Sequence, residues 1–198
     1  MRNILIGMIL VFLNFDITIG SSKIGLIPSF IGYAYMYSGV MELSDYSNKF
    51  VKIAPIIKVM IVCTGLIYLA DLLGLSAYLQ LPGVMISDIG VPSGFILFGI
   101  LLGLIVMIAS LYISYEIIQG IKDIESVQMK DLNSDQLLST WKLLAVLAFL
   151  SHALLIIVPG LAFICIILTM AMHIYYLFVF NKSKNLYYEN DENAFQED

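Results

Sequence analysis

The sequence predicts an all-α protein, a polytopic transmembrane helix bundle of six spans with its N-terminus and its C-terminus both inside the cell. The first observation is composition: 60% of the 198 residues are hydrophobic, only 13% are charged, and the mean hydropathy is +0.93. The second is that the apolar residues fall into six runs, and the third is that nearly all basic residues lie on one side of those runs. Soluble domains carry about 25% charged residues, so this composition excludes a soluble globular domain, a disordered chain and a nucleic-acid-binding protein.

Six apolar runs, separated by polar residues or by proline and glycine, define the expected spans. About 119 hydrophobic side chains match six helices of about 20 residues each, the length that crosses a bilayer. The spans are expected at residues 3–20, 25–43, 54–75, 93–118, 137–158 and 160–181. Together they form one transmembrane domain over residues 1–184.

The first span has a short apolar run, from Ile4 to Leu13, before Asn14 and Asp16 interrupt it. A run of about ten residues near an N-terminal arginine also suits the hydrophobic region of a signal peptide. Because Gly20-Ser21-Ser22 offers no A-x-A cleavage pattern, we favour a retained span over a cleaved one.

The later spans carry signals of their own. Pro28 lies in the first turn of the second span, where its missing N–H costs little. Lys58 in the third span can extend its side chain to the headgroups, and Trp141 marks the same interface on the fifth. Gly99 and Gly103 form a G-x-x-x-G pattern on the fourth span, which allows close approach of another helix. That neighbour is either a helix of the same chain or part of a homo- or hetero-oligomer.

The basic residues predict the orientation in the cell membrane. If the N-terminus is cytoplasmic, nine of the ten bases lie on the cytoplasmic side and only Lys23 lies outside. Cytoplasmic segments of membrane proteins are enriched in Lys and Arg. The nine are Arg2, Lys49, Lys52, Lys58, Lys122, Lys130, Lys142, Lys182 and Lys184.

The net charge of −5 comes from the C-terminal tail, since the last ten residues contain five acids and no base. A short acidic segment rich in Asn and Gln is typical of a solvated, disordered terminus. We therefore expect residues 185–198 to form an acidic disordered tail.

Ionisable residues inside a span are costly and suggest a site. Asp16, Asp71 and His152 lie in the outer third of the first, third and fifth spans, and Asn14 and Thr18 add polar atoms at a similar level. If these spans adjoin, the five residues form an outward-facing pocket for a cationic or polyhydroxylated small ligand. In the structural alternative, the two acids reach headgroup water and His152 donates to a backbone carbonyl.

No metal site and no cofactor are expected. His173 comes fourteen residues after Pro159, which places it about 10 Å deeper than His152. The two histidines are then too far apart to share a metal, whose bonds to nitrogen are about 2 Å. His173 could begin a proton path or be a packed, hydrogen-bonded histidine. Cys63 and Cys165 lie in apolar runs and suggest neither a disulfide nor a metal.

These features favour a non-catalytic membrane protein that binds or transports a small ligand. The alternative is a scaffold, sensor or accessory membrane subunit without a ligand site. An intramembrane hydrolase is disfavoured, because no nucleophile, base and orienting group meet at one depth. The expected partners are the lipid bilayer, a small molecule and, through Gly99 and Gly103, another helix.

The first quarter of the chain resembles a group of small integral membrane proteins of Gram-positive bacteria that have no known activity. The resemblance is carried by Phe15-Asp16-Ile17-Thr18-Ile19-Gly20, by Leu26 to Tyr33, and by Gly39 and Glu42-Leu43. In that group an Asp-containing turn precedes a helix that starts with a Pro-Asp-Phe-Ile-Gly-Tyr-like segment, and Ser29 replaces the acid here. The resemblance implies a bacterial membrane origin and no chemistry.

Overall fold

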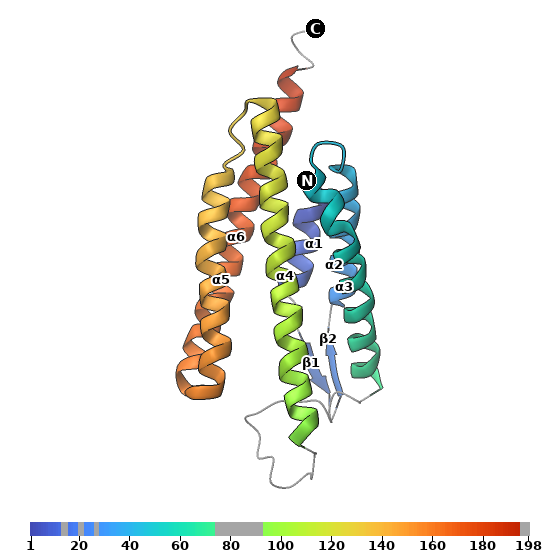
Figure 1. The fold of residues 1–198 in the computed structure, drawn as a ribbon, viewed down its shortest axis with the longest axis vertical. Helices are drawn as coiled ribbons and strands as arrows, with labels where there is room; N and C mark the ends of the chain where they lie inside the picture. The colour runs from blue at the N-terminus through green and yellow to red at the C-terminus, as the bar shows by residue number, and fades with distance from the viewer. Residues whose placement is uncertain (13–15, 20–21, 26–27, 74–92, 195–198) are drawn as a thin grey trace.

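The described part of the chain, residues 1–12, 16–19, 22–25, 28–73 and 93–194 of a computed structural model, consists of six helices and one pair of strands (Figure 1). The chain is helical, as predicted, with a short two-stranded insertion. The elements in chain order are α1 (Arg2–Phe12), β1 (Asp16–Ile19), β2 (Ser22–Gly25), α2 (Ser29–Glu42), α3 (Asn48–Leu72), α4 (Ser93–Gln128), α5 (Ser134–Ile157) and α6 (Pro159–Ala194).

Four of the helices are long and apolar enough to cross a membrane. The apolar stretches are Asn48–Ala70, Leu101–Gln128, Ser134–Leu154 and Gly160–Glu189, and each contains an 18-residue segment with a mean hydropathy between 1.6 and 2.2. Only 22–33% of each 18-residue segment is buried inside the protein. Most of this apolar surface therefore faces outward, the arrangement of helices surrounded by lipid.

The first two expected spans differ from the helices observed. The helix expected over 3–20 ends at Phe12, and the helix expected over 25–43 begins only at Ser29. At 11 and 14 residues, α1 and α2 are about 16 and 21 Å long, against a hydrocarbon core of about 30 Å.

An antiparallel strand pair occupies part of the sequence between α1 and α2. In its register Asp16 pairs with Gly25 and Ile19 with Ser22. The β-branched sequence Ile17-Thr18-Ile19 favours a strand, and Gly20-Ser21 has the composition of a two-residue hairpin connection.

Helix α6 continues through residues 185–194, which the sequence analysis expects to be disordered. Tyr187 is buried in the hydrophobic core, and the backbone N–H of Arg2 donates to the Tyr188 hydroxyl at 3.3 Å. These contacts hold this part of α6 in place. The composition of the segment shows its acidic charge but does not predict the contacts of the two tyrosines. Residues 195–198 lie outside the described part of the chain.

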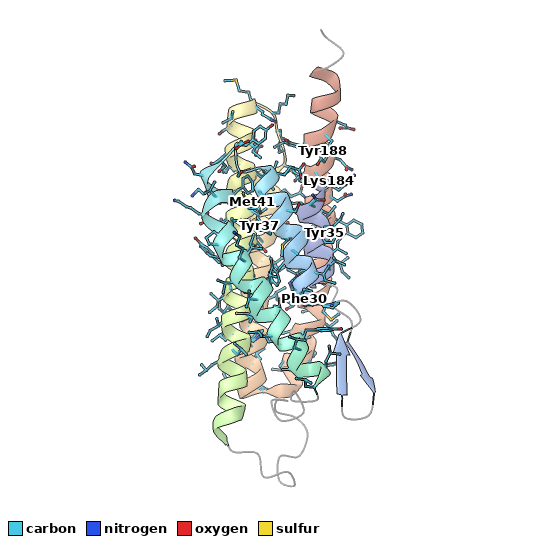
Figure 2. All side chains as sticks on the ribbon, turned by 90° about the vertical axis from the view of Figure 1, so that its right-hand side faces the viewer. Phe30, Tyr35, Tyr37, Met41, Lys184 and Tyr188 are labelled. Carbon is cyan, nitrogen blue, oxygen red and sulfur yellow. The ribbon has the colours of Figure 1, made fainter. Side chains whose placement is uncertain are left out.

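The helices form a closed ring in chain order. Each helix packs against the next, and α6 also packs against α1. In Figure 1 the start of α1 and the end of α6 lie toward the same end of the bundle as the α2–α3 and α4–α5 connections. Figure 2 shows α1, α2 and α3 from the side, with Tyr188 and Lys184 of α6 beside them.

Three glycines bring α1 and α2 into close contact. A Cβ added to Gly7 would lie 2.5 Å from the Gly32 carbonyl oxygen, and one added to Gly39 would lie 2.7 Å from the Ile4 nitrogen. Small residues allow helix backbones to approach closely in membranes, where lipid removes the usual hydrophobic drive between helices. The two short helices therefore form one tightly packed unit.

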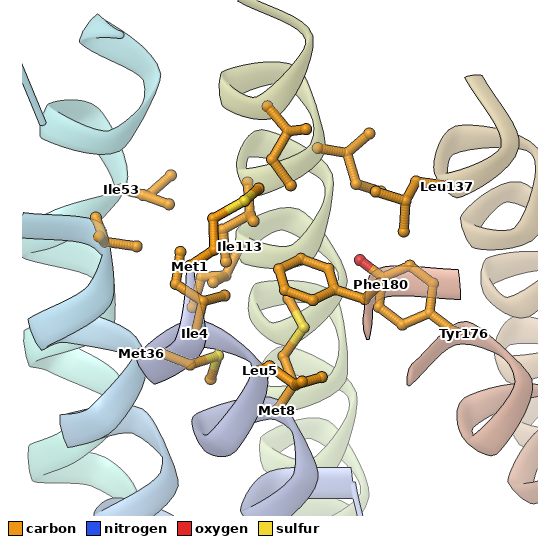
Figure 3. Packing of buried hydrophobic residues seen from close by; sticks show 14 of the residues in the cluster. Met1, Ile4, Leu5, Met8, Met36, Ile53, Ile113, Leu137, Tyr176 and Phe180 are labelled. Atoms are coloured by element: carbon orange, nitrogen blue, oxygen red, sulfur yellow. The ribbon is translucent and has the colours of Figure 1, made fainter. Parts of the chain in front are cut away.

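The hydrophobic core lies where the buried residues of α1 meet those of the other five helices (Figure 3). Met1, Ile4 and Met8 are completely buried there, and they meet residues of the other helices. These include Met36, Ile53, Ile113, Leu137, Tyr176 and Phe180.

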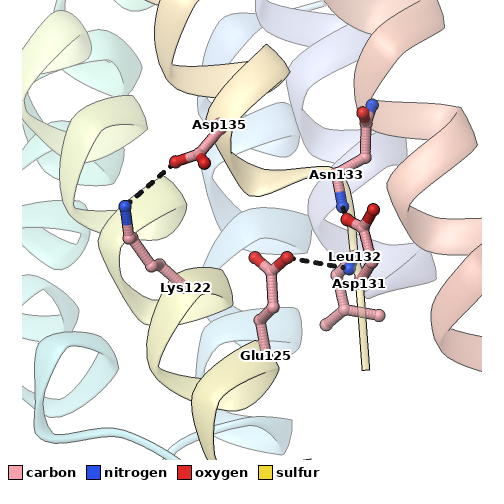
Figure 4. A network of polar contacts seen from close by, with 6 residues as sticks. All are labelled: Lys122, Glu125, Asp131, Leu132, Asn133 and Asp135. Atoms are coloured by element: carbon pink, nitrogen blue, oxygen red, sulfur yellow. Dashed lines mark hydrogen bonds and ion pairs between the residues drawn. The ribbon is translucent and has the colours of Figure 1, made fainter. Parts of the chain in front are cut away.

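Polar contacts stabilise the connection from α4 to α5 (Figure 4). Lys122 Nζ lies 3.0 Å from Asp135 Oδ1, and Glu125 Oε1 accepts from the Leu132 N–H at 3.2 Å. The Asn133 N–H donates to Asp131 Oδ1 at 2.7 Å. The N–H groups at the turn thus find side-chain acceptors.

Candidate functional site

A central cavity of about 350 Å³ lies inside the ring, and all six helices contribute to its wall. Its size is near the lower end of the range for small-molecule sites. The polar residues of the lining are Ser29, Tyr33, Thr64, Ser110, Ser114, Ser151, His152, Thr169 and His173. The other lining residues are Val11, Phe12, Gly103, Val106, Met107, Leu111 and Ala148.

The short helices α1 and α2 place the cavity along the bundle. Val11 and Phe12 end α1, and Ser29 begins α2, so the cavity lies at the level where these two helices meet the strand insertion. Beyond the end of α1 and the start of α2, the four long helices continue along the bundle. The space that two more full-length helices would fill is thus left to the cavity and the strands.

The cavity hydroxyls are held by the helices that carry them. Thr64 donates to the Met60 carbonyl at 2.6 Å, Ser114 to the Ser110 carbonyl at 2.9 Å, and Thr169 to the Cys165 carbonyl at 2.7 Å. Ser151 likewise donates to the Ala148 carbonyl at 2.8 Å. A hydroxyl that donates to a carbonyl keeps its lone pairs, so these groups offer acceptors to the cavity.

The two histidines are oriented in the same way. His152 Nδ1 lies 2.9 Å from the Ala148 carbonyl oxygen, and His173 Nδ1 lies 2.8 Å from the Thr169 carbonyl oxygen. A carbonyl only accepts, so Nδ1 is the donor in both rings, and Nε2 is the acceptor of the imidazole form that has a single N–H. The His173 ring also packs on Phe12, with 4.6 Å between ring centroids.

The structure describes one of the five predicted pocket residues in full. His152 lines the cavity and also makes the backbone hydrogen bond of the structural alternative. Asn14 lies outside the described residues. Asp16 and Thr18 belong to β1 and Asp71 to α3, but their side chains also lie outside the described part. Their convergence with His152 therefore stays a prediction.

The sequence predicts that His173 lies about 10 Å deeper than His152, yet both histidines line the same cavity. On α4 the lining runs from Gly103 to Ser114, about 16 Å along the helix axis. The cavity is therefore long enough to accommodate this difference in depth. The serine and threonine hydroxyls of the cavity wall are not among the predicted pocket residues, apart from Thr18, whose side chain lies outside the described part of the chain. Their signal is the four-residue spacing of Ser110 with Ser114 and of Thr169 with His173, which places each pair on one helix face.

The G-x-x-x-G face of α4 has no close neighbour at Gly103. A Cβ added there would meet nothing within 4 Å among the described atoms, and Gly103 lies in the cavity wall. The surroundings of Gly99 lie outside the described part of the chain. Among the described residues, the glycines whose added Cβ would meet the backbone of another helix are Gly7, Gly32 and Gly39 of α1 and α2, while Gly120 of α4 makes room for the Phe50 ring of α3.

Among the described residues, no group of three or more His, Cys, Asp or Glu could hold a metal ion. Cys63 and Cys165 are free thiols. The atoms of the described cavity wall that could bind a metal are hydroxyl oxygens and imidazole nitrogens, and the described wall has no carboxylate and no thiolate.

Comparisons with known proteins add no family to this description. No protein-family model, no curated protein and no solved structure matches the chain. The chemistry of the cavity is therefore the basis on which a function can be assigned.

Proposed function

We propose that the chain is a multi-pass protein of the cell membrane that binds a small ligand in the central cavity, or lets it pass, without a catalytic step. The observation that carries this proposal is that nine polar side chains gather around one cavity with an otherwise apolar wall, inside an apolar bundle. Polar and ionisable residues within a membrane are costly, and they mark ligand and ion pathways. Nine such residues on five helices around one space favour a ligand over nine unrelated structural roles.

The lining favours a ligand that donates hydrogen bonds. The described wall contains no Asp, Glu, Lys or Arg, and its hydroxyl oxygens and imidazole Nε2 atoms are acceptors. A polyhydroxylated molecule or an ammonium group supplies matching donors. In the proposed site His152 lies in the wall, and Asp16, Asp71, Asn14 and Thr18 are the outer residues that attract such a ligand.

The described cavity groups support binding more than catalysis. Ser114, Ser151 and Thr169 donate to helix carbonyls. A serine or threonine nucleophile needs instead a base within about 3 Å that takes its proton. The histidines likewise use Nδ1 for the backbone, so the contacts that hold the wall in place are structural.

The orientation in the proposal is N-inside and C-inside, and the cavity opens to the outer side. The positive-inside rule supports this orientation, because nine of ten bases lie on one side of the expected spans. The strand pair also supports water on the outer side. A two-stranded ribbon has unpaired edges, which are not tolerated in contact with lipid hydrocarbon.

Cysteine accessibility tests the outward opening. In a variant with Cys63 and Cys165 replaced by alanine, His152→Cys places a thiol on the cavity wall. We expect it to react with a small, charged, membrane-impermeant thiol reagent added to intact cells, and sugars or polyamines of the ligand class to slow the reaction. Leu150→Cys is the control, because Leu150 is exposed on the same helix but does not line the cavity.

The two positions give distinct outcomes. An unreactive His152→Cys in folded protein contradicts a cavity that opens outward. Equal reaction at both positions contradicts the membrane placement of this part of α5.

A scaffold or accessory subunit is the second candidate, and Gly103 is the observation that favours it. The space beside Gly103 belongs to the cavity wall, so a helix of another protein that packs on this glycine would take the place of a small ligand there. Co-purification of a fixed partner with the tagged chain supports this function, whereas a chain that purifies alone argues against it.

A further inference from the structure

A second site lies where α1, α2 and α6 meet, at the end of the bundle where the chain begins. It is a polar pocket of about 510 Å³, lined by Arg2, Asn3, Glu42, Lys184, Asn185 and Tyr188. Figure 2 shows Lys184 and Tyr188 above one another on α6. The hydrogen bond from the Arg2 N–H to the Tyr188 hydroxyl joins the ends of α1 and α6. The pocket shares no lining residue with the central cavity.

The charges of this pocket favour an anion. Arg2 and Lys184 contribute two positive charges against one negative charge from Glu42. All three charges act on the nearby Met1 ammonium, whose pKa is lowered mainly by burial. Lys184 Nζ donates to Asn181 Oδ1 at 2.8 Å, which holds the lysine head at the rim of the pocket.

An apolar groove of about 260 Å³ lies next to the pocket, between α1 and α6. Asn181 lines the groove and binds Lys184, which lines the pocket, so the groove and the pocket adjoin. On both helices the contributing positions are three or four residues apart, so they share one face. The groove is lined by Leu5, Ile9, Ile174, Leu177, Phe178 and Asn181.

The depth of this surface matches one leaflet of a bilayer. Measured from Gly160, where the apolar stretch of α6 begins, Ile174 lies about 21 Å and Lys184 about 36 Å along the helix axis. The hydrocarbon core is about 30 Å thick, or about 40–45 Å with the headgroups. Lys184 therefore lies among the headgroups, and the groove lies in the hydrocarbon of the same leaflet.

We propose that this surface binds one anionic phospholipid from the leaflet on the side of the termini. Arg2 and Lys184 bind its phosphate, and one acyl chain lies in the groove. Basic pockets between transmembrane helices on the cytoplasmic side recognise such headgroups, and arginine binds phosphate through two parallel hydrogen bonds. A phosphate diester carries one negative charge, which balances the net charge of the Arg2, Lys184 and Glu42 side chains. A zwitterionic lipid brings a further positive charge close to Arg2 and Lys184.

The test compares lipids on the purified full chain in detergent. Phosphatidylglycerol should raise the melting temperature and remain bound as a single molecule in native mass spectrometry. Phosphatidylcholine with the same acyl chains should do so more weakly, and inorganic phosphate not at all. Lys184→Gln and Arg2→Gln should each lower phosphatidylglycerol retention about fivefold, the effect of one basic residue at a membrane surface.

Matched variants separate this site from a general attraction between bases and lipid. Lys182→Gln removes an exposed base two residues from Lys184 on the same helix, and it should leave lipid retention unchanged. Ile174→Trp should fill the groove and weaken retention while both bases remain.

Three results would overturn the proposal. Equal retention of the two lipids by the unaltered protein does so, whether or not any variant folds. An equal loss on Lys182→Gln does so as well. Stabilisation by inorganic phosphate alone would identify a free-phosphate site instead.

Discussion

Tyr176 and Tyr188 lie twelve residues apart on α6, and their hydroxyls have opposite surroundings. Tyr176 is 1% exposed, and its hydroxyl has no hydrogen-bond partner among the described residues. The Tyr188 hydroxyl accepts from the Arg2 N–H and from the Met1 ammonium, both at 3.3 Å. The same side chain is therefore expected to weaken the fold at one position and to strengthen it at the other.

Tyr176→Phe should stabilise the protein. It removes a buried hydroxyl without a partner, a group that costs about 1–3 kcal/mol, and it keeps the aromatic contacts with Phe12 and Phe180. Tyr188→Phe should destabilise by about 1 kcal/mol because it removes hydrogen bonds between α1 and α6. Melting temperatures in detergent measure both variants. A lower melting temperature for Tyr176→Phe would show that its hydroxyl has a partner, such as a water molecule.

At the scale of elements, hydrophobic run length predicts the four long helices and fails for the two short ones. The runs of α3 to α6 exceed the length that a membrane needs, so small errors in their ends do not alter the assignment. The α1 run is short, and the β-branched residues after Asp16 favour a strand at the level where a helix was expected. The glycine contacts between α1 and α2 join different helices, so no spacing within one helix reveals them.

The C-terminal end of α4 has an unfavourable residue at its left-handed position. The Lys130 N–H donates to the Glu125 carbonyl, the hydrogen bond of a Schellman motif, and Met129 at the position between has φ 52°. Glycine is usual there, because any Cβ costs about 1–2 kcal/mol in this conformation. Met129 is 93% exposed, so its side chain makes little contact that a substitution would lose.

Met129→Gly should therefore stabilise the protein by about 0.5–1 kcal/mol, after the larger chain entropy of glycine in the unfolded state is subtracted. Met129→Ala is the control, because alanine retains the Cβ and should show no gain. Thermal unfolding in detergent compares the two variants. If alanine stabilises as much as glycine, the effect comes from loss of the methionine side chain and not from the backbone.

At the scale of the whole molecule, the cavity is a product of the closed ring. Its polar residues come from α2 to α6, and only His152 among them is prominent as an ionisable residue near a span's outer end. Serine and threonine are common in helices, and a sequence does not show which helices adjoin, so the hydroxyls could not be assigned to one site. Of the predicted pocket, His152 lies in the wall of this cavity, and the convergence of Asp16, Asp71, Asn14 and Thr18 with it stays a prediction.

The pairing of α1 with α2 helps to predict on which side of the membrane the start and the end of the chain lie. The two helices are joined through the strand pair, so they go into the bundle and return as a unit, whether or not either crosses the hydrophobic core. Four long helices follow, an even number. The start and the end of the chain are therefore expected on the same side of the membrane, together with the α4–α5 connection.

Labelling at that connection tests the orientation. In the variant without native cysteines, Met129→Cys provides an exposed thiol beside Lys130 and Lys122, which the positive-inside rule places in the cytoplasm. An impermeant thiol reagent should leave it unlabelled in intact cells and label it fully once the membrane is permeabilised. His152→Cys, at the cavity, should show the opposite sensitivity and react in intact cells. Labelling of Met129→Cys from outside would invert the topology, and with it the leaflet of the lipid site and the side to which the cavity opens.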